Sequence, residues 1–218
     1  DEIQILISDH DYKQIALPYW NISNTQDLMQ RFQIDDNEIE DEKLSSFLLR
    51  KSQGNPLYLT YVLKNIEEQT IINKNILNNI PDYDFNLASY YEYLSKQLED
   101  TTLTDILACL EFSVTEAELK EIIPQTRNLG KNLKILKPVI TQNISRGGIR
   151  LYHDSFRRFI IEKLSSETDF KETYKLIINW LNDKGFYTNA KSYRYLLGYL
   201  IKNEQYETRT FNASMKRR

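Results

Sequence analysis

The sequence predicts a mainly α-helical fold that contains one small β-hairpin. The six glycines and five prolines among 218 residues are few, which favours long helices over many tight turns. Apolar residues recur at helical spacing along most of the chain, whereas residues 139–141 and 149–152 form two strand-like runs. Hydrophobic residues make up 41% and charged residues 27%, a balance that can form a packed core.

The first hundred residues predict a strand followed by a series of helices. Residues 3–7 are aliphatic and β-branched, which is typical of a strand. Residues 35–41 are acidic and are expected to form a solvated connector. Asn24 or Thr25 is the expected cap of the second helix, and Pro56 holds the favoured first position of the fourth. The expected helices span residues 12–16, 25–32, 43–51, 56–67, 70–79 and 86–98.

Residues 101–166 predict a winged helix, which is a variant of the helix-turn-helix. Thr115 and Glu118 have the spacing of a capping box and mark the start of a helix. A turn through residues 146–148 joins the two strand-like runs into a hairpin. Three helices followed by a hairpin are typical of a winged helix. The other expected helices of this part span residues 103–111, 128–136 and 154–164.

Residues 167–207 predict the start of an α-helical array that resembles tetratricopeptide repeats. Trp180, Phe186 and Tyr187 are expected to pack between two paired helices. One pair of helices is too little to establish a repeat. Residues 208–218 end in three basic residues and are predicted to be a disordered tail. The expected helices span residues 169–183 and 189–201.

Two short motifs carry the functional interpretation: Gly54-Asn55-Pro56-Leu57 and Tyr152-His153-Asp154. The glycine permits a backbone that no β-carbon allows, and the proline fixes the start of a helix and offers a flat apolar face. The histidine is a suitable donor to phosphate, and the aspartate at the start of a helix can cap it and orient its neighbour. Taken separately, the first motif is equally an ordinary helix corner, and a lone histidine is more often structural.

Together the two motifs resemble those of STAND-class signal-transducing NTPases of the NACHT and NB-ARC type. The first is similar to the Gly-x-Pro element of their helical lid. The second is similar to the Met-His-Asp motif that ends their winged helix, with Tyr152 in place of the methionine. The resemblance covers about residues 3–165. It implies that residues 1–22 end the nucleotide-binding α/β core, that residues 23–100 are the lid, and that residues 101–166 are the winged helix.

The resemblance implies that this chain helps to bind ATP or ADP and couples ligand sensing to oligomerisation and effector activation. Pro56 would lie against the adenine, and His153 would contact the β-phosphate of ADP in the closed state. The implied partners are the nucleotide, other domains of the same protein, further copies of it on activation, and a protein ligand sensed by residues 167–207. Bacterial members of the family often serve in anti-phage defence. The implied nucleotide-binding residues are Gly54, Asn55, Pro56, Leu57 and His153.

Parts that ATP hydrolysis requires are absent from the sequence. It contains no Gly-x-x-x-x-Gly-Lys-Ser/Thr phosphate loop and no apolar run ending in paired acids that would hold Mg²⁺. The arginine with which the family senses the γ-phosphate is also missing from residues 8–10. The chain is therefore not expected to be catalytic alone, and in an intact protein the missing parts are expected upstream of Asp1. Two histidines and one cysteine exclude a metal site of the Cys/His kind.

A winged helix also raises the alternative of a DNA-binding transcriptional regulator. The net charge of −3 means that any nucleic-acid contact needs a local basic patch. No acidic residue lies between Glu121 and Asp154, and Asn128 and Asn132 are candidate base readers. The same cations could instead contact nucleotide phosphates or acidic neighbouring domains. The candidate basic face consists of Arg127, Lys131, Lys134, Lys137, Arg146 and Arg150.

The sequence favours a cytoplasmic protein with no membrane partner. Cys109 lies in an apolar run and is expected to be a buried, inert thiol. A single cysteine permits no disulfide within the chain, which fits a reducing cytosol. No apolar stretch approaches the ~20 residues needed to span a bilayer. The chain opens with Asp1-Glu2 and shows no signal peptide, and this start is expected to be a cut end.

Overall fold

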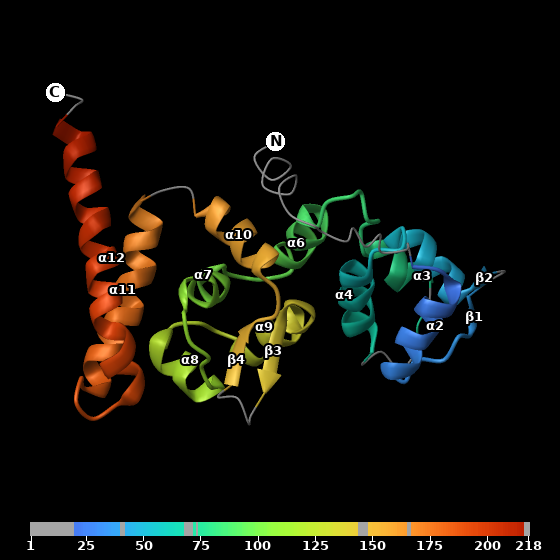
Figure 1. The fold of residues 1–218 in the computed structure, drawn as a ribbon, viewed down its shortest axis with the longest axis horizontal. Coiled ribbons are helices and arrows are strands. Elements are labelled where there is room, and N and C mark those ends of the chain that lie inside the picture. Colours follow the sequence, from blue (N-terminus) through green and yellow to red (C-terminus); the bar gives the residue numbers. More distant parts are fainter. Residues whose placement is uncertain are drawn as a thin grey trace, which may run out of the picture.

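The computed structural model confirms the mainly α-helical fold. Helices account for most of the described residues, and two small antiparallel sheets of two strands accompany them. Figure 1 shows an N-terminal part, a central part and a C-terminal pair of helices arranged in a row. The predicted strand at residues 3–7 and helix at residues 12–16 lie outside the described residues. The structure describes residues 20–39, 42–67, 72, 74–143, 148–164 and 167–215.

The N-terminal part, residues 20–100, contains most of the helices expected there and a short hairpin that the sequence did not predict. The hairpin falls in the acidic stretch that was expected to be a connector, and its strands pair Glu38 with Lys43 and Ile39 with Glu42. The elements of this part are α2 (Ile22–Arg31), β1 (Glu38–Ile39), β2 (Glu42–Lys43), α3 (Leu44–Ser52), α4 (Pro56–Ile66), α5 (Lys74–Asn79) and α6 (Ala88–Ser95).

Two capping side chains in this part differ from the expectation. Asn21, rather than Asn24 or Thr25, caps α2, and its side chain accepts a hydrogen bond from the backbone N–H of Asn24 at 3.1 Å. Asp36 is more than a solvated acid, because its carboxylate accepts hydrogen bonds from the backbone N–H and the hydroxyl of Ser45, each at 2.8 Å. The hairpin brings Asp36 back over the start of α3, where a carboxylate satisfies the unpaired N–H groups of the first turn.

The central part, residues 101–164, has the element order of a winged helix. The predicted capping box is confirmed, since the side chains of Thr115 and Glu118 each accept a hydrogen bond from the other's backbone N–H. The hairpin pairs Ile140 with Leu151, and Val114 adds a bridge to Ile149 at its other edge. Its elements are α7 (Thr102–Cys109), α8 (Glu116–Ile122), α9 (Leu129–Leu136), the 3₁₀ turn η1 (Lys137–Val139), β3 (Ile140–Asn143), β4 (Gly148–Leu151) and α10 (Asp154–Lys163).

The C-terminal pair consists of α11 (Glu167–Lys184) and α12 (Ala190–Met215), which run side by side in opposite directions (Figure 1). Helix α12 continues to Met215, which differs from the disordered tail predicted for residues 208–218. The chain beyond Gly198 contains no glycine or proline, so no residue there breaks the helix. Residues 216–218 lie outside the described part of the chain.

A cluster of buried tyrosines joins the N-terminal part to the central part. Tyr61 of α4 stacks on Tyr90 of α6 with ring centroids 5.5 Å apart, and Tyr91 meets Phe156 of α10 edge to face at 5.0 Å. These rings bury large apolar surfaces while their hydroxyls keep hydrogen-bond partners. Three ion pairs border this interface: Lys131–Glu99 at 2.9 Å, Lys137–Glu67 at 2.5 Å and Lys163–Glu92 at 2.7 Å.

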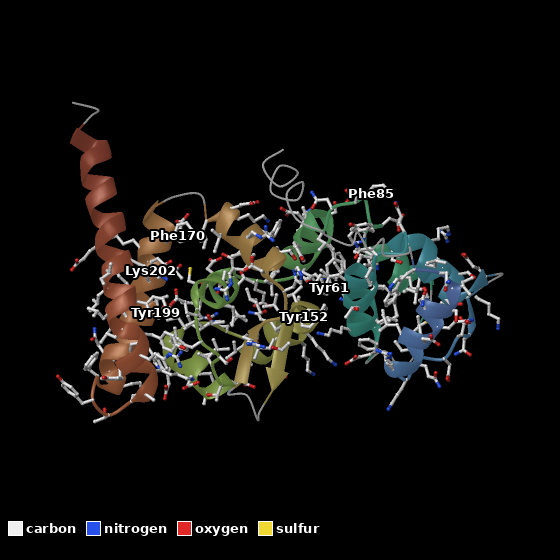
Figure 2. All side chains as sticks on the ribbon, in the orientation of Figure 1. Tyr61, Phe85, Tyr152, Phe170, Tyr199 and Lys202 are labelled. Atoms are coloured by element: carbon white, nitrogen blue, oxygen red, sulfur yellow. The ribbon has the colours of Figure 1, made fainter. Side chains whose placement is uncertain are left out.

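The C-terminal pair packs on the central part through α7 and α8. Figure 2 shows Tyr199 and Lys202 on the side of α12 that faces α7. The Tyr199 hydroxyl donates to the carbonyl of Cys109 at 3.0 Å and accepts from the backbone N–H of Glu111 at 2.9 Å. The prediction that Cys109 is buried is confirmed, and burial raises the pKa of its thiol to about 12. Among the described residues no helix is both long and apolar enough to cross a membrane.

Candidate functional site

The first sequence motif forms a sharp turn between α3 and α4. Gln53 and Gly54 both adopt positive φ angles, of +47° and +72°. A β-carbon at Gly54 would stand 3.0 Å from the carbonyl oxygen of Trp20, which is tighter than ordinary contact. Glycine is therefore required here by both backbone conformation and space.

The residues after this glycine start α4 and leave one apolar face in solvent. The Asn55 side chain caps the helix by accepting from the backbone N–H of Tyr58 at 2.9 Å. Pro56 occupies the first helical position and is exposed, while Leu57 is half-buried. Pro56 is thus a rigid, solvent-facing ring on a helix start that asparagine and proline together define.

His153 is the N-terminal cap of α10, and this contact sets the direction of its imidazole. Its Nδ1 accepts a hydrogen bond from the backbone N–H of Ser155 at 3.1 Å and lies 2.7 Å from the Ser155 hydroxyl oxygen. A neutral imidazole that accepts at Nδ1 carries its proton on Nε2. We therefore assign the Nε2–H tautomer, and because the residue is exposed this N–H faces solvent.

A chain of hydroxyl groups connects His153 to the tyrosine cluster of the N-terminal part. The Ser155 hydroxyl lies 2.5 Å from the hydroxyl of Tyr91, which lies 3.3 Å from that of Tyr61. Burial is the main cause that raises the pKa of both tyrosines, that of Tyr61 well above its usual range, so their hydroxyls remain protonated. Hydrogen bonds that run from Tyr61 through Tyr91 and Ser155 to Nδ1 fit the tautomer assigned to His153.

Tyr152, which stands where the family motif has methionine, also reaches the N-terminal part. Its ring meets Tyr61 edge to face at 6.4 Å, and the ammonium of Lys64 lies 4.1 Å from its centroid. Figure 2 shows Tyr61 and Tyr152 beside each other between α4 and the central part. Tyr152, immediately before His153, and Ser155, two residues after it, therefore both contact helices of the N-terminal part.

The two sequence motifs do not touch each other directly. Within the described part of the chain, no hydrogen bond or ion pair joins residues 54–57 to His153. They are linked instead through α4, which begins at Pro56 and presents Tyr61 to the ring of Tyr152. The nucleotide-binding roles assigned to these residues by resemblance stay predictions.

The residues predicted to form a basic face on the central part have different environments in the structure. Asn132, a candidate base reader, is 1% exposed, so it cannot reach a base and that expectation is wrong. Asn132 lies on the face of α9 that packs into the core. Which face of the helix is buried depends on tertiary packing. Lys131 and Lys137 pair with Glu99 and Glu67 of the N-terminal part. Arg127 and Lys134 have no ion pair in the described residues, and Arg146 lies outside them.

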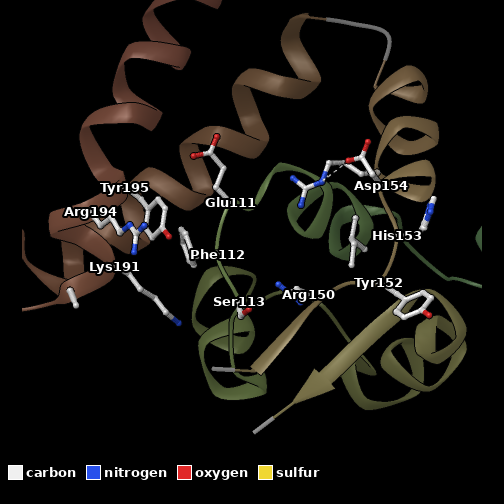
Figure 3. A pocket seen from close by; sticks show the side chains of 13 residues that line it. Glu111, Phe112, Ser113, Arg150, Tyr152, His153, Asp154, Lys191, Arg194 and Tyr195 are labelled. Atoms are coloured by element: carbon white, nitrogen blue, oxygen red, sulfur yellow. Dashed lines mark ion pairs between the residues drawn. The ribbon is translucent and has the colours of Figure 1, made fainter. Parts of the chain in front are cut away.

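Arg150 lies in a groove that the sequence did not predict. The groove measures about 710 Å³ and opens between the central part and the start of α12, and His153 lies at one end of its lining. Figure 3 shows Lys191 and Arg194 on the α12 side, Arg150 at the strand end, and His153 beyond Tyr152 at the opposite side. Sequence reasoning missed Lys191 and Arg194, because no local pattern relates α12 to a strand some forty residues earlier.

Metal binding finds no support in the part of the chain that is described, where no group of three or more His, Cys, Asp or Glu side chains is placed to hold an ion. Comparison of the chain with protein-family models, with curated proteins and with solved structures found no match.

Proposed function

We propose that this chain is the regulatory portion of a STAND-class NTPase, with the N-terminal part as lid and the central part as winged helix around bound ATP or ADP. The observation that carries the proposal is the fixed imidazole of His153. Its Nδ1 is occupied by Ser155, and its Nε2–H faces solvent as a donor. A positioned N–H of this kind is suited to a phosphate oxygen, which is a strong acceptor.

The turn before α4 supports the same proposal. The backbone at Gly54 disfavours other residues, and the turn ends in the exposed ring of Pro56. An exposed, rigid apolar ring is a suitable surface for the flat face of a purine base. Asn55 is committed to capping α4, so its role in the proposed site is to place Pro56 rather than to contact the base.

Contacts on both sides of His153 support a role as a switch. Because Tyr152 and Ser155 touch Tyr61 and Tyr91, a change in the position of the imidazole alters the interface between lid and winged helix. A nucleotide that binds His153 in one arrangement favours that arrangement over others. In the proposal, a protein ligand recognised by the C-terminal pair opposes it, and the open state assembles into oligomers and activates an effector.

The DNA-binding alternative has weaker support. Asn132 is buried, Asn128 donates to Glu99, and two of the candidate cations are paired with acidic residues of the N-terminal part. A phosphate backbone would have to compete with these carboxylates for the same lysines.

The proposal is tested by replacing His153 in the intact protein in two ways. His153→Asn keeps a side-chain oxygen that can cap α10 but removes the Nε2–H donor, whereas His153→Ala removes both. We expect both variants to retain roughly tenfold less ADP through purification, because a hydrogen bond to a charged group is lost. The measurement is the ADP content of the purified protein, determined by chromatography of the extracted nucleotide.

The control variant is Glu162→Gln, an exposed change on α10 away from the imidazole. It should retain ADP as the unmodified protein does, and the two His153 variants should also signal without a stimulus. Normal ADP content and normal signalling in His153→Asn would contradict the proposal. Loss of ADP in His153→Ala alone would assign the residue a capping role and no ligand contact.

A further inference from the structure

The groove beside the central part has positive charge that the carboxylates of its lining do not neutralise. Both carboxylates of its lining are paired with cations. Glu111 pairs with Lys202, and Asp154 pairs with Arg158 at 3.2 Å and, at the longer distance of 3.8 Å, with Arg157 of the lining. The negative charge in the groove is therefore largely compensated before any ligand arrives. Its four cationic lining residues are Arg150, Arg157, Lys191 and Arg194.

The side chains of two of these cations have hydrogen-bond or ion-pair partners, and those of the other two do not. Arg157 donates to the carbonyls of Ala108 and Leu110, and Lys191 holds both carboxylate oxygens of Glu118 at 2.7 Å. In the part of the chain that the structure describes, the side chain of neither Arg150 nor Arg194 forms a hydrogen bond or an ion pair. Both side chains are exposed, and they approach the groove from different elements, β4 and α12 (Figure 3).

An aromatic wall adjoins the two free guanidinium groups. Phe112 and Tyr195 contact each other with ring centroids 4.8 Å apart, and both line the groove half-buried. The guanidinium carbon of Arg194 lies 5.4 Å from the centroid of Tyr195. The groove thus combines unpaired cations with an apolar surface. This combination suits a ligand that carries an anionic group and a flat apolar group.

We propose that this groove binds a small phosphate ester that carries an aromatic ring. The phosphate lies between Arg150 and Arg194, and the ring lies against Phe112 and Tyr195. A phosphate presents oxygens in several directions and can accept from guanidinium groups on two walls, whereas a planar carboxylate is satisfied by one. The N-terminus of α12, at Ala190 in the lining, adds a partial positive charge.

Occupation of the groove would hold the C-terminal pair against the central part. Arg150 belongs to the central part and Arg194 to α12, so one phosphate that contacts both binds tightly only when the two parts are docked. The ligand therefore stabilises the docked arrangement by mass action. This inference goes beyond the proposed function, because the site uses neither the Nε2–H of His153 nor the turn at Pro56.

In the test, the full 218-residue chain is titrated with phenyl phosphate and binding is measured by isothermal titration calorimetry. Inorganic phosphate and benzoate are titrated in parallel, because each lacks one of the two groups that the groove is expected to recognise. Phenyl phosphate should bind more tightly than either. Arg150→Gln and Arg194→Gln should each weaken its binding by roughly tenfold, as expected when a charge-assisted hydrogen bond is lost.

Lys134→Gln is the matched control, since it removes the same charge from an exposed position on α9 outside the groove. It should leave phenyl phosphate binding unchanged. Equal weakening by Lys134→Gln, or benzoate binding as tight as phenyl phosphate, would overturn the proposal. Absence of phenyl phosphate binding to the unmodified chain would overturn it as well.

Discussion

At the scale of single residues, the orientation of the His153 imidazole depends on the polar network around it. Ser155 binds Nδ1 of His153, and the hydroxyl of Ser155 also contacts the hydroxyl of Tyr91 in the N-terminal part. A hydrogen-bond network of this kind fixes side-chain orientation only when each member has its partner. The direction of the imidazole is therefore set jointly by residues from α6 and α10.

This network predicts energetic coupling between Ser155 and Tyr91. Ser155→Ala removes the serine hydroxyl but keeps the backbone N–H that donates to Nδ1 of His153. Tyr91→Phe removes the tyrosine hydroxyl. In a double-mutant cycle we expect a coupling energy of about 0.5–1.5 kcal/mol, the usual net value of a hydrogen bond. Urea unfolding of the four proteins measures it. Additive effects of the two changes would show that the hydroxyls do not interact.

At the scale of elements, the turn between α3 and α4 is the most constrained connection of the N-terminal part. Two consecutive positive φ angles end α3 and aim α4 at the central part. Asn55 then satisfies an N–H of the first turn of α4, so helix end, turn and helix start are determined within four residues. The position of Tyr61 against Tyr152 depends on this turn, because both Pro56 and Tyr61 belong to α4.

Two glycine substitutions test this constraint. Gly54→Ala should lower the free energy of unfolding by about 1–2 kcal/mol, because alanine is strained at positive φ and its β-carbon meets the Trp20 carbonyl. Gly130→Ala on α9 meets nothing within 4 Å and should be neutral or raise stability by up to about 1 kcal/mol. Thermal unfolding of both variants measures the difference. A Gly54→Ala protein as stable as Gly130→Ala would contradict the strain.

At the scale of the whole molecule, the C-terminal pair docks through a small number of specific contacts. The Tyr199 hydroxyl serves two backbone groups at the end of α7, and Glu121 accepts hydrogen bonds from the indole of Trp180 and the ammonium of Lys184, each at 2.9 Å. Most of the other contacts there are aromatic packing around Phe112. Movement of the pair away from the central part would break both hydrogen bonds of the Tyr199 hydroxyl and expose this aromatic packing to water.

Removal of one hydroxyl tests this docking. Tyr199→Phe should lower the free energy of unfolding by about 1–3 kcal/mol, because the Glu111 N–H and the Cys109 carbonyl lose their partner. The amide of Glu111 should also exchange its hydrogen faster, which hydrogen-exchange measurements resolve. Tyr193→Phe, at a position that is 68% exposed on the same helix, is the control and should change neither quantity. Unchanged exchange at Glu111 in Tyr199→Phe would show that this contact does not hold the pair.

The sequence by itself determined most of the elements and the two motifs. The capping box at Thr115, the helix start at Pro56 and the hairpin before His153 were all predictable, because each depends on neighbours within a few residues. The positive φ at Gly54 was equally local in origin, whereas its close approach to the Trp20 carbonyl was not. What the sequence could not indicate was the direction in which a helix turns a given side chain, as the burial of Asn132 on α9 demonstrates.

Only the tertiary structure decided which distant residues meet. Asp36 caps α3 because a hairpin returns the chain, and Arg194 shares a groove with Arg150 because α12 packs beside the central part. The tautomer of His153 follows from Ser155, whose hydroxyl is in turn held by Tyr91 from another part of the molecule. Such contacts depend on how whole helices pack, and packing is a sum over many weak contacts that no short stretch of sequence contains.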